Sequence, residues 1–230
     1  MDRSRIALAC AAVLGAIAAV LPVPANASRQ IYEYRILHPT FGNVGTYTNT
    51  IDRLGDKTEV TTELHVLVKL LGIVVFQQEA ERTELWQGDR MIAFHSVTNT
   101  NGDALIVSGV AQGNDFVITT PTGVSTAPAN VHPSNPWSLK VFESDTMMST
   151  KTGEFFPVSV NDSGQVDVSI DGAALKLHRY DIIGRKHDVV WLDDNGVPVA
   201  FEIEQGNTLV DFHLARSLNQ PEYVSADLSH

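Results

Sequence analysis

Cysteine is almost absent from this sequence, and clusters of positive charge are absent too. The single cysteine, Cys10, lies within the first 27 of 230 residues, so the remainder of the chain cannot form a disulfide. Lys and Arg number 16 against 27 Asp and Glu, which gives a net charge of −11. Nucleic acids are bound through clustered Lys and Arg. The charge therefore argues against nucleic acid, and against an anionic lipid surface, as the main partner.

The motifs of common enzyme classes are missing as well. The eight histidines form no HExxH and no His-x-His pair, whereas zinc needs three or four converging ligands. Neither the serine-hydrolase pattern G-x-S-x-G nor a glycine-rich phosphate loop occurs. Aromatic residues make up only 7% of the chain and form no ladder on which a carbohydrate would stack. The sequence gives no reason to assign a catalytic residue, a metal or a cofactor.

The N-terminus has the composition of a secretory signal peptide. Two arginines precede an uncharged apolar stretch, Ile6–Leu21, which is followed by Pro22, Pro24 and the small-residue sequence Ala25-Asn26-Ala27. This order predicts export and cleavage after Ala27. A membrane anchor is the alternative, but the apolar stretch is shorter than the roughly 20 residues that span a bilayer. We expect a periplasmic protein without an integral membrane span after cleavage.

Cleavage would leave residues 28–230, which are 203 residues without cysteine. Removal of residues 1–27 takes away two basic residues and one acidic residue, so the net charge becomes −12. A chain of this length buries roughly 70% of its unfolded surface and needs no disulfides. No linker divides it, so we expect one domain.

Turn signals recur at short intervals and separate segments with a repeat of two. We expect strands at 31–37, 46–54, 59–71, 73–86, 91–100, 104–111, 116–120, 158–160, 166–170, 175–182, 189–192, 199–204 and 209–214. Asp162-Ser163-Gly164 and Asp171-Gly172 are typical of hairpin turns, and Val166, Val168 and Ile170 alternate with polar residues. The pattern predicts an all-β fold with an antiparallel, strongly curved sheet or an open β-barrel.

One segment, Pro121–Met148, interrupts the strand pattern. It contains four prolines and, at its centre, His132, Ser134, Asn135 and Trp137. Only residues 134–148 have room for a short helix, so we expect one short helical or Pro-rich crossing segment. Long ordered loops are often functional. The alternative is a structural plug in which Trp137 is buried over one end of the barrel.

The segment Leu64–Phe76 is apolar on both faces of the pleat, apart from His65 and Lys69. Strands of this kind occur where both faces are covered, or where one face lines a dry cavity. Both alternatives stay open. On the cavity interpretation, Leu67, Leu71 and Val74 are candidate ligand contacts, together with His132, Asn135 and Trp137 from the crossing segment.

Three stretches carry a resemblance to a known family: Glu63–Trp86, Ala127–Ser138 and the hairpin Trp191–Val199. Together they resemble an uncharacterised family of exported bacterial β-proteins, a domain of unknown function. The hairpin alone is also similar to one in periplasmic lipoprotein carriers of the LolA type. That resemblance implies a curved antiparallel sheet around an apolar hollow that holds acyl chains, and transfers no individual binding residue.

These observations favour a periplasmic protein that binds or carries an apolar, lipid-like small molecule inside the curved sheet, and they favour a binding protein over an enzyme. Two alternatives remain. One is a periplasmic hydrolase that uses His132, Ser134 and Asn135. The other is an envelope interaction module that uses an exposed strand edge. The sequence does not specify the ligand, a protein partner or the oligomeric state.

Overall fold

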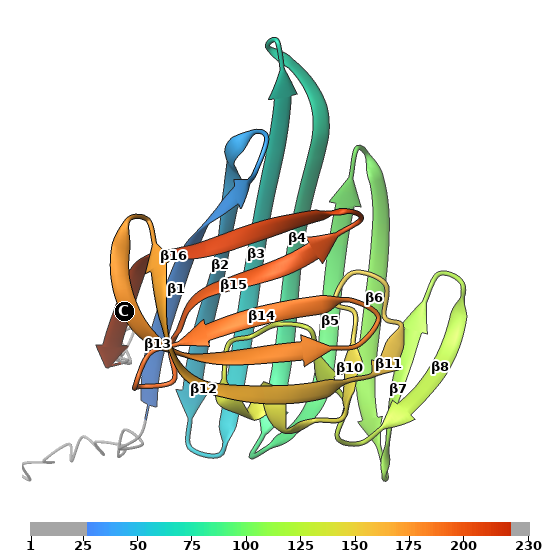
Figure 1. Cartoon of the computed structure of the whole chain (residues 1–230). Coiled ribbons are helices and arrows are strands. Elements are labelled where there is room, and N and C mark those ends of the chain that lie inside the picture. Colours follow the sequence, from blue (N-terminus) through green and yellow to red (C-terminus); the bar gives the residue numbers. More distant parts are fainter. Residues whose placement is uncertain (1–26, 222–230) are drawn as a thin grey trace, which may run out of the picture.

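The computed structural model describes residues 27–221 and confirms the all-β expectation (Figure 1). One large sheet has 13 strands, and each strand is antiparallel to its neighbours. Its strands are β1 (Ala27–His38), β2 (Gly42–Leu54), β3 (Lys57–Leu70), β4 (Ile73–Gln87), β5 (Arg90–Thr100), β6 (Asp103–Gln112), β7 (Asp115–Thr120), β8 (Gly123–Pro128), β12 (Ser159–Ile170), β13 (Ala173–Ile183), β14 (His187–Leu192), β15 (Pro198–Gln205) and β16 (Thr208–Pro221).

The sheet consists of two meanders joined through the strand that begins the chain and the strand that ends it. Strands β1 to β8 follow one another, as do β12 to β16, and β16 pairs with β1 at positions such as Ile31 and Leu218. The strongly curved sheet brings the second meander across the face of the first (Figure 1). Among the described strands, β8 and β12 form the two edges, so the sheet does not close into a barrel.

The connection between the meanders, residues 129–158, is called the crossing segment below. It holds a small sheet of β9 (His132–Pro133), β10 (Thr146–Met148) and β11 (Phe155–Pro157), and one 3₁₀ turn, η1 (Leu139–Glu143). The Ser138 hydroxyl accepts a hydrogen bond from the Lys140 backbone N–H and caps η1. The expected short helical or Pro-rich crossing is therefore confirmed.

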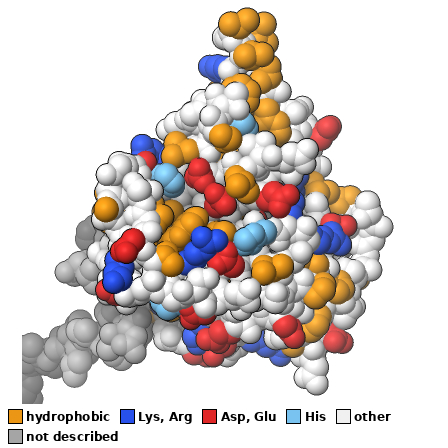
Figure 2. All heavy atoms as spheres, viewed as in Figure 1, with side chains coloured by type: hydrophobic (Ala, Val, Ile, Leu, Met, Phe, Trp, Pro, Cys, Tyr) orange, Lys and Arg blue, Asp and Glu red, His pale blue; other side chains and the backbone are white. Residues whose placement is uncertain are grey.

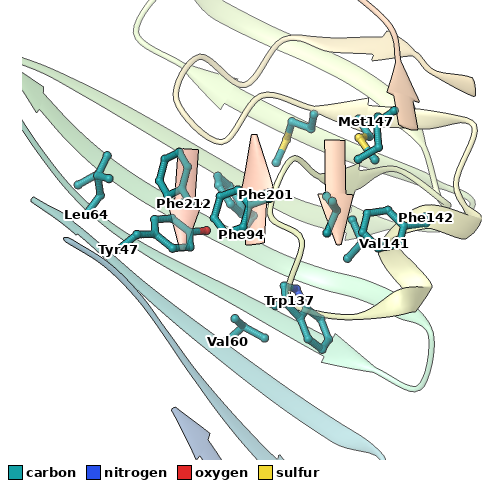
Figure 3. Close-up of a cluster of buried hydrophobic side chains, with 14 of the residues drawn as sticks. Tyr47, Val60, Leu64, Phe94, Trp137, Val141, Phe142, Met147, Phe201 and Phe212 are labelled. Atoms are coloured by element: carbon teal, nitrogen blue, oxygen red, sulfur yellow. The ribbon is translucent and has the colours of Figure 1, made fainter. Parts of the chain in front are cut away.

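The core lies between the two meanders and contains side chains of the crossing segment (Figure 3). The rings of Phe201 and Phe212 stack with their centroids 4.3 Å apart, and the Tyr47 ring meets both edge-on. On the crossing segment, Phe142 and Met147 point into the same core. The alternation of strand residues explains this arrangement, because every second side chain of a curved strand points inward.

One detail of the second meander differs from the sequence prediction. Asp162-Ser163-Gly164 does not form a hairpin turn; it is a bulge inside the single strand β12, where the pairing register shifts between Asp162 and Gln165. The Asp162 carboxylate accepts a hydrogen bond from the Gly164 backbone N–H, and Gly164 has φ of 70°. The local hydrogen bond of Asp and the positive φ of Gly thus suit a β-bulge as well as a turn.

The prediction that both faces of Leu64–Phe76 are covered or line a cavity is wrong for the outer part of this segment. Leu64 and Val68 are buried, but the side chains between Lys69 and Val75 are exposed on both faces of the β3–β4 hairpin. Strand β8 was also missed, because a short edge strand that ends at Pro128 lacks apolar alternation.

The predicted signal peptide lies outside the described residues except for Ala27, which begins β1 and pairs with Leu54. Within residues 27–221 there is no helix that is long and apolar enough to cross a membrane.

Candidate functional site

The structure separates the six expected ligand contacts into two groups. The first group, Leu67, Leu71 and Val74, lies at the end of the β3–β4 hairpin, where these side chains are exposed to solvent. They line no interior space. The sequence pattern that singled them out therefore marks a surface feature and not the wall of a cavity.

The second group, His132, Asn135 and Trp137, lies on the crossing segment, and all three side chains are buried. The Trp137 side chain projects from the crossing segment toward the first meander, as Figure 3 shows. The structure thus supports the plug interpretation for this stretch, and brings these three residues together in the interior but not with the hairpin residues.

The residues expected for a hydrolase do not form a nucleophile–base pair. Within residues 27–221, no hydrogen bond joins His132 to Ser134, and the His132 Nδ1 atom has no hydrogen-bond partner. The His132 ring lies edge-on to the Trp86 ring at a centroid distance of 5.0 Å. Burial lowers the pKa of His132, which favours the neutral form of the imidazole. A serine hydrolase needs the hydroxyl within hydrogen-bond reach of the base, and this arrangement does not provide it.

Asn135 is instead the centre of a buried polar network. Its Oδ1 atom accepts hydrogen bonds from the Tyr47 hydroxyl at 2.6 Å and from the Asn49 amide at 3.0 Å. Its Nδ2 atom donates to Glu84 Oε1 at 2.8 Å and to Thr62 Oγ1 at 3.1 Å. The Asn135 side chain is only 1% exposed. One amide therefore ties the crossing segment to three strands of the first meander, β2, β3 and β4.

Glu84 is a fully buried carboxyl group in this network. Its Oε2 atom accepts hydrogen bonds from the indole N–H groups of Trp86, at 3.0 Å, and of Trp137, at 2.9 Å. The two indole rings lie edge to face at a centroid distance of 5.6 Å. Burial raises the pKa of Glu84 to about 7, although the hydrogen bonds from Asn135, Trp86 and Trp137 and the charge of Arg82 oppose this rise.

The polar residues of the first meander form a row across the sheet. Asn49, Thr62, Arg82 and Ser96 are direct partners on β2, β3, β4 and β5, and all four are buried. Burial lowers the pKa of Arg82, while nearby Tyr47 and Glu84 raise it. Arg82 Nε and Ser96 Oγ have no hydrogen-bond partner within the described residues, and such buried polar atoms cost about 1–3 kcal/mol each.

This network was missed by sequence reasoning, although β4 carried a signal. The inward positions of β4 alternate in the order Ala80, Arg82, Glu84 and Trp86, so two charged residues share the phase of a buried tryptophan. The side chains of the network are buried, and they hydrogen-bond to one another. The network anchors the crossing segment to the first meander, and it contains one buried carboxyl group, that of Glu84.

Apolar space is found at two places beside the small sheet. The first space, the interior void, has a volume of about 30 Å³. Its walls are Ser134, Asn135, Pro136, Val141, Phe142 and Met147 from the crossing segment, and Ile182, Asp188, Val190, Phe201, Glu202 and Ile203 from the second meander. A void of this size holds about two water molecules.

The second space, the outer groove, is open to solvent and has a volume of about 560 Å³. It is lined by Phe155, Phe156, Pro157, Val158, Ser159, Ile183, Gly184 and Arg185. The Arg185 guanidinium donates a hydrogen bond to Glu154 at 2.8 Å and lies over the Phe156 ring at 5.4 Å from its centroid. The groove is therefore apolar with one cation at its rim. Sequence analysis did not single out any of these residues.

The void and the groove both border the small sheet and the end of β13. Met147 of β10 lines the void, and its cross-strand partner, Phe156 of β11, lines the groove. Ile182 lines the void, and the next residue, Ile183, lines the groove. Among the described residues, no group of three His, Asp, Glu or Cys side chains is placed to hold a metal ion.

Comparisons with known proteins give a family and a fold. A family model described as a domain of unknown function (DUF6134) matches residues 34–215. A crystal structure of a beta-barrel-like protein of domain of unknown function DUF1849 from Brucella abortus is similar, with a TM-score of 0.58 and 9% sequence identity. The alignment covers 85% of this chain and 98% of that chain. The search of curated proteins gives no match.

Proposed function

The chain belongs to the DUF6134 family, whose domain has no known function, and we propose that this member is an exported, periplasmic protein that binds an apolar, lipid-like ligand. The outer groove is the proposed entry, and the apolar side chains beneath the crossing segment are the proposed continuation of the site. The resemblance to an uncharacterised β-protein family is confirmed by the family match; the ligand and the compartment are our proposal.

The observation that carries the proposal is the size and lining of the outer groove. Its volume of about 560 Å³ lies within the range of about 300–1,000 Å³ that small-molecule sites occupy. Five of its eight lining residues are apolar, two of them phenylalanines. Full burial of one CH₂ group contributes about 0.8 kcal/mol, so about 6 kcal/mol before ordering costs is the upper limit for eight methylenes in this solvent-open groove.

The interior void offers a continuation for a longer chain. It is too small for an acyl chain as it stands, so a ligand that extends inward has to displace β10 and β11. These are strands of three residues each, joined by pairing at Met147 with Phe156 and at the positions on either side. The side-chain hydrogen bonds of the Glu84–Asn135 anchor are separate from the β10–β11 ladder. β10 also pairs with β9, at Met147 with His132 and at Met148 with Pro133. The first part of the crossing segment is thus held by buried side-chain hydrogen bonds, and the last part by short ladders.

The single cation at the groove points to a ligand with one anionic head group. The Arg185 guanidinium is at the rim, where a carboxylate or phosphate would compete with Glu154 for its donors. Arg is suited to this role because its planar fork binds such groups in a bidentate manner. A fatty acid has the required combination of a carboxylate and a single apolar chain.

The test is binding of a fluorescent fatty acid, cis-parinaric acid, whose emission rises in an apolar site. The variant Ser159→Trp fills the groove from an exposed position, and Ser169→Trp adds the same side chain at an exposed position of the same strand outside the groove. We expect saturable binding by the unaltered protein and by Ser169→Trp, and at least tenfold weaker binding by Ser159→Trp. Absence of saturable binding, or equal affinity of the two variants, would overturn the proposal.

A further inference from the structure

The hairpin of β3 and β4 extends beyond the strands on either side of it (Figure 1). Pairing of β2 with β3 ends at Val66, and pairing of β4 with β5 begins at Gln78. Beyond these two positions, β3 and β4 pair with each other as far as Leu70 and Ile73. The end of the hairpin, residues 67–75, is called the apolar tip below.

Apart from Val68, which is buried, the side chains of the apolar tip are exposed on both faces of the hairpin. Leu71 at the apex is 96% exposed and Ile73 is 70% exposed. The exposed apolar residues are Leu67, Leu70, Leu71, Ile73, Val74 and Val75. Because successive strand residues point to opposite faces, consecutive residues 73–75 make both faces of the hairpin apolar. Figure 2 shows hydrophobic side chains gathered at this projection at the top of the molecule.

The residue at the apex is not one that the turn itself favours. Leu71 has φ of 51°, in the left-handed region. The other non-glycine residues with positive φ in the described part of the chain are Asn101 and Asp171, and these two types tolerate this region because their side chains bond locally. A leucine here is strained and places its apolar side chain in solvent. Local folding therefore does not account for its presence.

Charge is distributed unevenly between the tip and the rest of the protein. The chain carries a net charge of −11, yet residues 64–78 contain no Asp or Glu and one fully charged residue, Lys69. Carboxylates are expelled from an acyl layer at high cost, whereas a lysine side chain reaches from an apolar environment back to the headgroups. The composition of the tip fits a lipid layer.

We propose that the apolar tip docks the protein on a lipid surface by insertion at the boundary between headgroups and acyl chains. A flat protein partner would cover one face of the hairpin, whereas fluid lipid surrounds both faces and the apex. From Leu67 to Leu71 the hairpin rises about 13 Å, so the tip is long enough to reach the roughly 5–10 Å to which interfacial elements insert. The outer backbone groups of this two-stranded end lack strand partners, so insertion stops short of the hydrocarbon centre.

The docking surface is distinct from the outer groove and does not rest on the proposed ligand. Attraction between the tip and lipid is apolar, so an anionic surface is not required, in keeping with the negative charge of the chain. The test is co-sedimentation with vesicles of phosphatidylcholine. The variant Leu71→Asn/Ile73→Thr removes two apolar side chains and introduces residues that suit a positive φ and a strand.

The matched control is Val124→Asn/Ile106→Thr, which removes two other exposed apolar side chains far from the hairpin in the sequence. We expect the partition coefficient of the tip variant to fall about tenfold or more and that of the control to stay within twofold of the unaltered protein. All samples carry the same N-terminus, verified by sequencing, so residues 6–21 do not contribute to the difference.

Several results would overturn the docking proposal. The first is that the unaltered protein does not sediment with the vesicles, and the second is that the tip and control variants bind equally. A third is that sedimentation velocity shows a dimer that the tip variant alone abolishes, with vesicle binding unchanged, which would assign the tip to a second copy of the chain. Loss of vesicle binding in Ser159→Trp, with the tip intact, would assign the lipid contact to the groove.

Discussion

The ionisation of Glu84 is expected to make the free energy of unfolding of the protein depend on pH. A carboxyl group whose pKa rises from 4.5 in the unfolded chain to about 7 in the folded protein is destabilised in its ionised form by about 3 kcal/mol. The folded state then binds more protons than the unfolded state between these two pH values. The contribution of Glu84 to the free energy of unfolding is therefore fully present below pH 4.5 and is lost as the pH rises through about 7.

The perturbation is Glu84→Gln, which keeps the shape of the side chain and removes the titration. The assay is urea unfolding followed by circular dichroism at pH 4.5 and pH 8. We expect the free energy of unfolding of the variant, relative to the unaltered protein, to rise by about 3 kcal/mol between the two pH values. The matched control is Glu81→Gln, on the exposed face of the same strand, for which the relative stability should change by less than about 0.5 kcal/mol.

Two results would refute this reasoning. If the stability difference between Glu84→Gln and the unaltered protein is the same at both pH values, burial does not control the ionisation of Glu84. If the difference falls as the pH rises, the three N–H donors and Arg82 outweigh burial, and the group is ionised at both pH values. Comparison with the Glu81→Gln control separates either result from a general effect of surface charge.

Three further predictions concern the anchor, the sheet and the groove. Asn135→Ala leaves Glu84 Oε1 and Asn49 Nδ2 without their hydrogen-bond partner, and should lower the free energy of unfolding by about 3 kcal/mol; a loss below about 1 kcal/mol in urea unfolding would contradict the role of the anchor. Gly45→Ala places a Cβ 1.9 Å from the His65 carbonyl oxygen, so the melting temperature should fall by at least about 10 °C, and an unchanged melting temperature would contradict the close approach of β2 and β3. Arg185→Gln should weaken palmitate binding about three- to fivefold and leave methyl palmitate binding unchanged in a parinarate displacement assay, whereas an equal effect on both would remove the head-group role.

The strand order within each meander was largely predictable, because it depends on signals that lie within each strand and each turn. Each meander strand alternates between inward and outward residues, as in Val166, Val168 and Ile170, and most turns carry Gly or Asn at the position that requires a positive φ. Asp171 and Gly172 form such a turn, with φ of 52° and 81°. Neighbouring strands in a meander then pair in sequence order, so the antiparallel sheet follows from spacing alone.

The bulge in β12 and the environment of the β3–β4 hairpin were not predictable from the same signals. The sequence Asp-Ser-Gly is compatible with either a turn or a bulge. The bulge forms because β13 pairs with β12 on both sides of it, from Ser159 to Ile170 of β12. The exposure of Leu71 depends on where β2 and β5 end, because these neighbours stop before the hairpin does. Both outcomes are set by strands distant in sequence.

The buried network and the groove were missed for the same reason. Asn135 meets Glu84 across 51 residues and Tyr47 across 88 residues, and no local pattern reports such a contact. Glu84 and Trp86 are two residues apart in β4, so their side chains point to the same face of the sheet. A search of each strand for charged residues on the inward face would therefore have identified Glu84. The groove arises where β11 meets the end of β13, and its cation, Arg185, resembles an ordinary turn residue in the sequence.

Native mass spectrometry of protein recovered from its own cells tests most directly whether the protein carries an apolar ligand. We predict a fraction of molecules whose mass exceeds that of the chain by one lipid-sized molecule, released by organic solvent and identified in the extract. The bare mass of the chain in every preparation, with no lipid in the extract, would contradict the proposal.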